Sequence, residues 1–253
     1  MGPMRLEWHA ATDVGAVRKI NEDRYFASEP LGLWAVADGM GGMSRGDWAS
    51  TQAVEAVGLA VHRGDLEGML HEAAGALRQA NDAILAESEA QGTRMGTTAV
   101  VLVVRDNRFG VCWVGDSRAY LLRDRRLHRL TKDHSQVQDM VDHGIITAEE
   151  MERHPSRNVL TRAIGVQPDL AVDSIVDTVL PEDLFLLCSD GLHGVIGEAE
   201  ICEILLRAPL PRAGAALIER CHALGAPDNV TLVTVAAEEV TLVQFGEGAA
   251  GAQ

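Results

Sequence analysis

Four closely spaced apolar runs decide the fold: TTAVVLVV (97–104), RFGVCWV (108–114), AYLL (119–122) and RLHRL (126–130). Short polar turns such as RDN (105–107) and RDR (123–125) separate them. Strands joined by so few residues pair antiparallel, because a parallel connection needs a dozen or more residues. The stretch therefore predicts an antiparallel meander in the middle of the chain.

The flanking regions add both strands and helices. Alternation around Leu6, Trp8 and Ala10 and the run LGLWAVA (31–37) predict opening strands. Apolar residues then recur at three and four positions, which predicts two helices, the second capped by Asp65. The helices are predicted at 47–61, 65–88, 198–206 and 212–224, and later strands at 171–177, 184–189 and 230–236. Strands and helices in separate runs indicate an α+β fold, with enough strands for two stacked antiparallel sheets flanked by helices.

Residues from about 134 to 165 differ from their surroundings. They are polar and rich in histidine, and Thr147 and Glu150 match a capping box for a short helix. This segment is interpreted as a flap inserted into one domain that covers residues 1–240. The end of the chain, residues 241–253, is expected to be a partly disordered tail.

Composition excludes some partners. The 253 residues include 37 acidic and 22 basic side chains, and the formal net charge of −15 would repel a nucleic-acid backbone. The four cysteines have no CxxC spacing and are expected to be buried, reduced thiols. No apolar stretch approaches the roughly 18–20 residues that span a bilayer, and the first residues lack a signal-peptide pattern. A cytoplasmic location is therefore expected.

Four aspartates stand next to predicted strands. Asp38 ends LWAVA, Asp116 and Asp190 follow VCWVG and LFLLCS, and Asp228 lies just before VTLVTV. In an antiparallel sheet the end of one strand lies beside the start of its neighbour, so all four can share one edge. That arrangement would form an acidic cluster.

Aspartate is also a common turn former, so each Asp-Gly pair alone fits a routine turn. A two-residue Asp-Gly hairpin, however, returns directly into a strand. Here Asp38-Gly39 continues as MGGMSRG (40–46) and Asp190-Gly191 as LHGVIG (192–197), each toward a predicted helix. Such glycine-rich loops suit a close approach of the backbone to a ligand.

The expected ligand is a divalent cation. Gathered carboxylates repel one another unless a cation is present, and hard cations prefer oxygen ligands. Zinc is disfavoured because no histidine pair or cysteine set stands at ligand spacing. The cluster therefore predicts Mg²⁺ or Mn²⁺.

These segments together resemble the metal-dependent serine/threonine protein phosphatases, also called the PPM or type 2C family, in their compact bacterial form. Eight motifs occur in the family's order, from Thr12 to about Val235. They are TDVGAVRKINEDRY (12–25), VADGMGG (36–42), GTTAV (96–100), VGDSRAYLLRD (114–124), LTKDHS (130–135), HPSRNVLTRAIG (154–165), LLCSDGL (186–192) and PDNVTLV (227–233).

The resemblance implies a four-layer αββα sandwich with two metal ions at one edge of the sheets. It implies that Asp38 bridges the ions, that Asp190 and Asp228 complete one of them, and that the Gly39 carbonyl serves the other. Asp38 and Asp190 are therefore expected to be essential for catalysis.

Three residues of the first motif also receive roles from the resemblance. Glu22 and Asp23 are expected to hold metal-bound waters. Arg18 is expected to bind the substrate phosphate, a task for which the fork of guanidinium donors is suited.

The implied reaction is the removal of phosphate from phosphoserine and phosphothreonine of proteins. A metal-bridging hydroxide is expected to attack directly, with no phosphoenzyme intermediate, which leaves Ser117 a structural role. The partners are expected to be substrates of a Ser/Thr kinase, and the enzyme to be a monomer.

The sequence departs from the family at the proton donor and at the third metal. Met40 stands where eukaryotic members carry histidine, and methionine cannot protonate the leaving alkoxide. A metal-bound water or His193 is left for that task. Gly194 replaces an aspartate of many relatives, so a weaker third ion would depend on Asp116 and Asp190.

Two other classes are compatible with parts of the pattern. A catalytically silent phosphoprotein-binding module would have lost metal ligands, whereas Asp38, Asp190 and Asp228 are all present. A metal-dependent nuclease or phosphodiesterase is disfavoured by the acidic composition and the lack of a basic stripe.

Overall fold

Two five-stranded antiparallel sheets form the centre of the computed structural model, which describes residues 4–41, 45–151 and 153–239. The first sheet has the order β1-β12-β11-β8-β9 and the second the order β10-β7-β6-β3-β2. The strands of the first sheet are β1 (Met4–Asp13), β12 (Val230–Glu239), β11 (Leu184–Cys188), β8 (Arg118–Arg123) and β9 (Arg126–Arg129). Those of the second are β10 (Asp173–Thr178), β7 (Arg108–Val114), β6 (Ala99–Arg105), β3 (Leu33–Ala37) and β2 (Arg24–Ser28).

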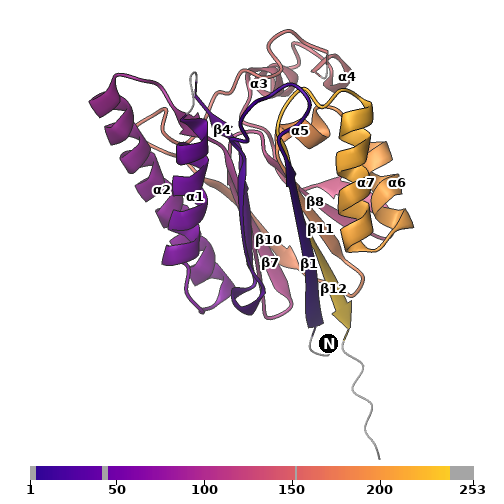
Figure 1. Ribbon diagram of the computed structural model, residues 1–253. Helices are drawn as coiled ribbons and strands as arrows, with labels where there is room; N and C mark the ends of the chain where they lie inside the picture. The colour runs from indigo at the N-terminus through magenta and orange to yellow at the C-terminus, as the bar shows by residue number, and fades with distance from the viewer. Residues whose placement is uncertain (1–3, 42–44, 152, 240–253) are drawn as a thin grey trace, which may run out of the picture.

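Helices cover the outer face of each sheet (Figure 1). Two long helices, α1 (Gly46–Ala60) and α2 (Leu66–Gln91), pack on the second sheet. The helices α5 (Asp190–His193), α6 (Glu198–Arg207) and α7 (Leu210–Ala223) lie against the first sheet. The layers therefore follow the predicted αββα order. Within the described residues, no helix is both long and apolar enough to cross a membrane.

Three apolar clusters hold the layers together. Trp34, Phe109 and Phe185 belong to the central one, which fills the space between the sheets. The two others lie between each sheet and its helices. The central strands β3, β6 and β7 are buried along nearly their whole length, because both of their faces are covered.

The predicted meander is wrong in one respect. β6 pairs with β7 and β8 pairs with β9, but β7 and β8 belong to different sheets. The chain crosses between the sheets at Gly115, whose positive φ of 97° is readily adopted only by glycine. Each strand then pairs with a distant one, β7 with β10 and β8 with β11, and Asp116 lies at the crossing.

Local signals for helix starts are confirmed. The Gly68 amide donates to the Asp65 side chain at 2.8 Å, which caps α2. Thr147 and Glu150 form the reciprocal capping box at the start of α4 (Ala148–Met151), with distances of 2.8 and 3.2 Å.

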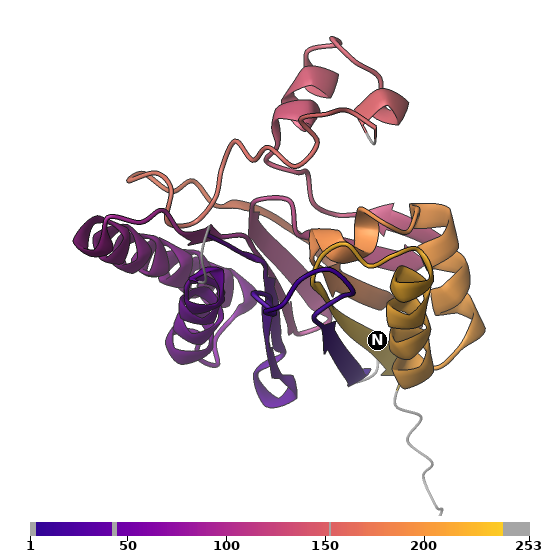
Figure 2. The same ribbon diagram turned by 45° about the horizontal axis from the view of Figure 1, so that its top comes forward.

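The predicted flap contains α4 and the preceding α3 (Gln136–Asp142). It stands out from one end of the sandwich (Figure 2). Two backbone hydrogen bonds between Thr97 and Ile164, at 2.9 and 3.0 Å, tie the end of this segment to the body. The flap is therefore anchored next to the edge where the aspartates were expected.

Three strands and one thiol differ from expectation. β2 was not predicted, and β4 (Gly39–Met40) lies where a glycine-rich loop was expected. β4 pairs with β5 (Gly96–Thr97), a separate short strand that contains the first residue of the predicted strand 97–104. Cys202 is only half-buried, because its side chain lies near the surface of α6, whereas the other three cysteines are buried free thiols. The predicted tail, residues 241–253, lies outside the described residues.

Candidate active site

A hollow of about 640 Å³, here called the catalytic hollow, lies at one end of the sandwich. The predicted site residues that line it come from both sheets and their loops: Arg18, Glu22, Asp38, Gly39, Asp116, Asp190 and Asp228. The structure thus brings together the four aspartates that the sequence separates by up to 190 positions. Asp23 lies below the hollow and is almost fully buried.

Two threonines fix the position of Asp38 at the end of β3. The Asp38 amide donates to the Thr98 hydroxyl at 3.0 Å, and the Thr97 hydroxyl donates to the Asp38 carbonyl at 2.8 Å. The Thr98 hydroxyl also bonds to Ser117 Oγ at 2.6 Å. These contacts use the backbone of Asp38 and leave its carboxylate for a ligand. Ser117 is buried, which agrees with its predicted structural role.

Glycine is required after both Asp38 and Asp190. A Cβ on Gly39 would lie 2.1 Å from the Gly46 carbonyl oxygen, and one on Gly191 would lie 1.8 Å from the Asn229 carbonyl oxygen. Such distances are far shorter than van der Waals contact, so larger residues would push these segments apart. The Asp-Gly pairs therefore serve the close packing of backbones around the hollow.

Asn229 organises the loop that carries Arg18. Its side-chain amide donates to the carbonyls of Val14 and Ile20 at 2.8 and 3.0 Å, and its Oδ1 accepts from the Glu22 amide at 2.8 Å. This role was not predicted, although the PDN motif that contains Asn229 was recognised. A side chain that satisfies three backbone groups fixes the loop against β12.

Arg18 and Glu22 face the hollow with different partners. Arg18 Nη2 donates to Asp228 Oδ2 at 2.7 Å, and both side chains are partly exposed. Glu22 Oε1 accepts from the Gly46 amide at the start of α1 at 3.0 Å. Arg18 is thus placed beside a predicted metal ligand, within the same hollow.

Burial and mutual repulsion raise the pKa of the clustered carboxyl groups. Asp38, Asp116 and Asp190 keep partial access through the hollow, but protein surrounds each carboxyl group and this burial raises its pKa. Neighbouring carboxylates raise them further, with Asp23 acting on Asp38 and Asp228 acting on Asp190. Burial raises the pKa of Asp23 to about 7, although Ser189 donates to its Oδ2 at 2.7 Å.

These residues fit a divalent cation. Asp23 Oδ1 is buried and has no hydrogen-bond partner among the described residues. Within the same part of the chain, the contact of Arg18 with Asp228 is the one ion pair that the clustered aspartates form.

Within the described segments, no group of three acidic, histidine or cysteine side chains lies close enough together to hold one metal ion. The predicted ligand set places three carboxylates, those of Asp38, Asp190 and Asp228, on one ion, so these side chains would have to draw closer together when it binds. The other ion would take Asp38, the Gly39 carbonyl and waters.

The metal-free protein is expected to lose stability as pH rises from about 4 to 7. Folding raises the pKa of Asp23 to about 7, so the folded state holds more protons in this interval than the unfolded state. Divalent cations should therefore raise Tm more at pH 7.5 than at pH 5.5. Thermal melts with Mn²⁺ and with a chelator at both pH values test this, and an equal rise in Tm would contradict it.

His193 does not line the catalytic hollow. Its Nε2 lies 3.0 Å from the carbonyl of Asp116 and donates to it. Burial, followed by the nearby Arg118, lowers the pKa of His193 to about 3. The imidazole is therefore neutral at pH 7 and holds the Asp116 backbone, which argues against His193 as the proton donor.

Six residues of the flap, 158–163, line the catalytic hollow, among them the polar Asn158 and Arg162. Asn158 and Arg162 were part of a recognised motif but received no role. Arg162 Nη1 donates to Asp173 Oδ1 at 2.6 Å, which ties the end of the flap to the start of β10. Apart from the motif itself, no sequence signal predicts this contact.

Comparisons with known proteins agree with the fold. The family model described as protein phosphatase 2C matches residues 16–205. The chain is 39% identical to the serine/threonine protein phosphatase PstP of Mycobacterium tuberculosis over 90% of its own length and 44% of that protein. It is 35% identical to the serine/threonine phosphatase stp of Listeria innocua over 94% of this chain and 97% of that one.

A solved structure of the PstP catalytic domain in complex with two manganese ions is also similar. It has a TM-score of 0.84 and 35% identity, and the match covers 94% of this chain and all of that one. The fold and the acidic hollow fit the class of metal-dependent phosphatases. The chain belongs to the protein phosphatase 2C family of serine/threonine phosphatases.

Proposed function

We propose that this chain removes phosphate from phosphoserine and phosphothreonine of proteins by direct hydrolysis, with no phosphoenzyme intermediate. The observation that carries the proposal is the convergence of Asp38, Asp116, Asp190 and Asp228 in one hollow beside Arg18. The family to which the chain belongs supports the substrate class, since its relatives are serine/threonine protein phosphatases.

The residues of the catalytic hollow have three different roles in this proposal. Asp38, Asp190, Asp228 and the Gly39 carbonyl would hold two Mg²⁺ or Mn²⁺ ions, with Glu22 and Asp23 orienting waters. When bound, the ions supply an activated water and neutralise the phosphoryl oxygens. Arg18 binds and orients the phosphate. Direct hydrolysis is supported by the burial of Ser117, the serine beside Asp116, which does not line the catalytic hollow.

The test is hydrolysis of a phosphothreonine peptide with Mn²⁺, with Mg²⁺ and after chelation. Activity is expected only with added metal, and a phosphodiester oligonucleotide should remain intact. Hydrolysis in ¹⁸O-water that left no label in the released phosphate would contradict direct attack by water. Full activity in metal-stripped protein would contradict the whole assignment.

Arg18→Ala is expected to raise KM for small phosphoesters and to lower kcat/KM roughly 10- to 150-fold, the loss of a charge-assisted contact worth about 1.5–3 kcal/mol. Metal affinity, measured by calorimetry, should not fall, because Arg18 competes with cations for Asp228. The matched variant Arg18→Lys keeps the charge but loses the fork of donors and should be intermediate. Loss of metal from Arg18→Ala would assign Arg18 a structural role instead.

We also propose that the enzyme acts as a monomer in the cytoplasm on proteins phosphorylated by a Ser/Thr kinase. The four free thiols fit a reducing compartment. Light scattering in solution tests the oligomeric state. A stable dimer at micromolar concentration would contradict it.

A further inference from the structure

A second hollow, of about 430 Å³ and here called the basic hollow, lies between the flap and the first sheet. Four arginines line it: Arg118 from β8, Arg129 from β9, and Arg153 and Arg157 from the flap. Nothing in the proposed catalytic mechanism uses these four side chains. Their gathering is unusual for a chain with a formal net charge of −15.

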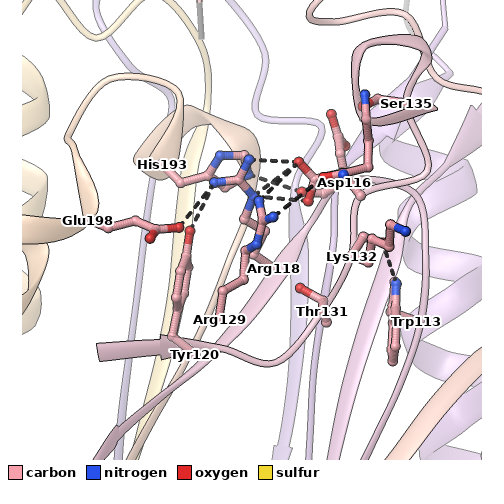
Figure 3. Close-up of polar contacts among 12 residues, drawn as sticks. Trp113, Asp116, Arg118, Tyr120, Arg129, Thr131, Lys132, Ser135, His193 and Glu198 are labelled. Carbon is pink, nitrogen blue, oxygen red and sulfur yellow. Dashed lines mark hydrogen bonds and ion pairs between the residues drawn. The ribbon is translucent and has the colours of Figure 1, made fainter. Parts of the chain in front are cut away.

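Arg118 forms the floor of the basic hollow and is already paired. Its guanidinium donates to both carboxylate oxygens of Asp133, at distances from 2.6 to 3.2 Å, and to the Tyr120 hydroxyl at 3.0 Å. Burial alone would raise the pKa of Asp133, but the contacts with Arg118 outweigh burial and lower it. Figure 3 shows Arg118 and Arg129 together with His193 and Glu198 beside Asp116.

The other three arginines are less engaged. Arg129 approaches Asp133 only at 3.9 Å and Gln138 at 3.4 Å. Arg153 and Arg157 are exposed, and neither forms a side-chain hydrogen bond or ion pair with another residue that the structure describes.

Four carboxylates also line the basic hollow: Asp116 and Asp190, which it shares with the catalytic hollow, and Asp133 and Glu198, which lie within 4 Å of Arg118. The positive charge that no carboxylate of the described residues neutralises therefore lies on the flap side, on Arg153 and Arg157.

The basic hollow continues into the catalytic hollow. Asp116, Asn158 and Asp190 line both. A polypeptide whose phosphorylated residue occupies the catalytic hollow would thus place neighbouring residues at the basic hollow. An extended chain advances about 3.3 Å per residue, so residues within a few positions of the phosphorylated one can reach the basic hollow, and positions two to four residues away are the range to test.

We propose that the basic hollow binds a second anionic group of the substrate polypeptide, a few residues from the phosphate that is removed. Guanidinium forks match the oxygens of both phosphate and carboxylate, so the group is a second phosphorylated residue or an acidic side chain. The second anionic group is bound by Arg129, Arg153 and Arg157. The ion pair of Arg118 with Asp133 supports the floor of the hollow. This inference rests on the proposed function, since it concerns the same substrate.

The experiment compares phosphothreonine peptides that differ at one neighbouring position. A second phosphothreonine, Glu or Gln is placed in turn two, three and four residues before and after the scissile residue. The measurement is the ratio of kcat/KM to that of the Gln peptide. At one or more positions an anionic residue should raise the ratio at least about fivefold, and added NaCl should reduce the gain because these charges are partly exposed.

A double variant and a matched control assign the gain to the basic hollow. Arg153→Gln with Arg157→Gln should bring the ratio close to one. Arg126→Gln with Arg212→Gln removes the same charge from exposed positions outside both hollows and should retain the ratio. Circular dichroism and Tm check that both variants fold.

The outcomes are distinct. If both Glu and phosphothreonine raise the kcat/KM ratio, the basic hollow accepts carboxylate as well as phosphate. If phosphothreonine alone raises it, the ligand is phosphate. No gain at any position, or a gain that persists in Arg153→Gln/Arg157→Gln, would overturn the inference. If the singly phosphorylated peptides were not hydrolysed at all, the proposed function itself would fail.

Discussion

Replacement of Asp38 by Asn is expected to lower kcat at least about a thousandfold on every phosphate ester. Loss of a residue that only supports a metal ligand, or of a single group that stabilises charge in the transition state, already lowers metal affinity or activity about 10- to 1,000-fold. Asp38 is the one carboxylate predicted to contact both ions. Its side chain lies among Asp23, Asp190, Asp116 and Asp228, all of which act on its pKa. An amide keeps the shape but loses the charge that binds a cation.

The fold of Asp38→Asn should survive, because Thr97 and Thr98 contact the backbone of this residue and not its carboxylate. The metal-free variant is expected to melt at the same temperature as the unmodified chain or above it, because removal of the charge relieves repulsion. Asp106→Asn is the matched control, since Asp106 is exposed in a turn with φ of 50°, which Asn also adopts. Normal turnover by Asp38→Asn would refute the metal assignment.

Local patterns predicted the helices and the acidic edge well. The 3.6-residue period depends only on neighbouring positions, and α1 lies within one residue of the predicted bounds 47–61. Asp38 and Asp190 were identified because an Asp-Gly pair after a strand failed to return as a hairpin, a signal contained within ten residues. In both cases, the residues that make up the pattern are close together in the sequence.

Contacts between distant segments were not predictable in this way. The pairing of β8 with β11 joins Leu122 to Leu184, and no local spacing distinguishes it from the expected pairing with β7. Asn229 contacts Val14 across 215 positions, so its function as an anchor is visible only in the folded chain. The same holds for the basic hollow, whose arginines come from β8, β9 and the flap.

Asp116 is expected to matter most when the leaving group needs a proton. It lies at the crossing between the sheets, lines both hollows, and is held through its carbonyl by His193. Met40 offers no proton, and His193 is turned away from the catalytic hollow. Asp116, with Asp190, is therefore the candidate ligand of a weaker third ion, because Gly194 contributes no carboxylate.

Asp116→Ala is expected to lose about 100-fold in kcat on a phosphothreonine peptide, the lower end of the 10²–10⁴-fold typical of general acid catalysis. The loss on p-nitrophenyl phosphate should stay below about tenfold, because its leaving group needs little protonation. Calorimetry should still detect two tightly bound ions. Equal losses on the two substrates would refute a role in protonation, and the loss of a tight ion would place Asp116 in the binuclear centre.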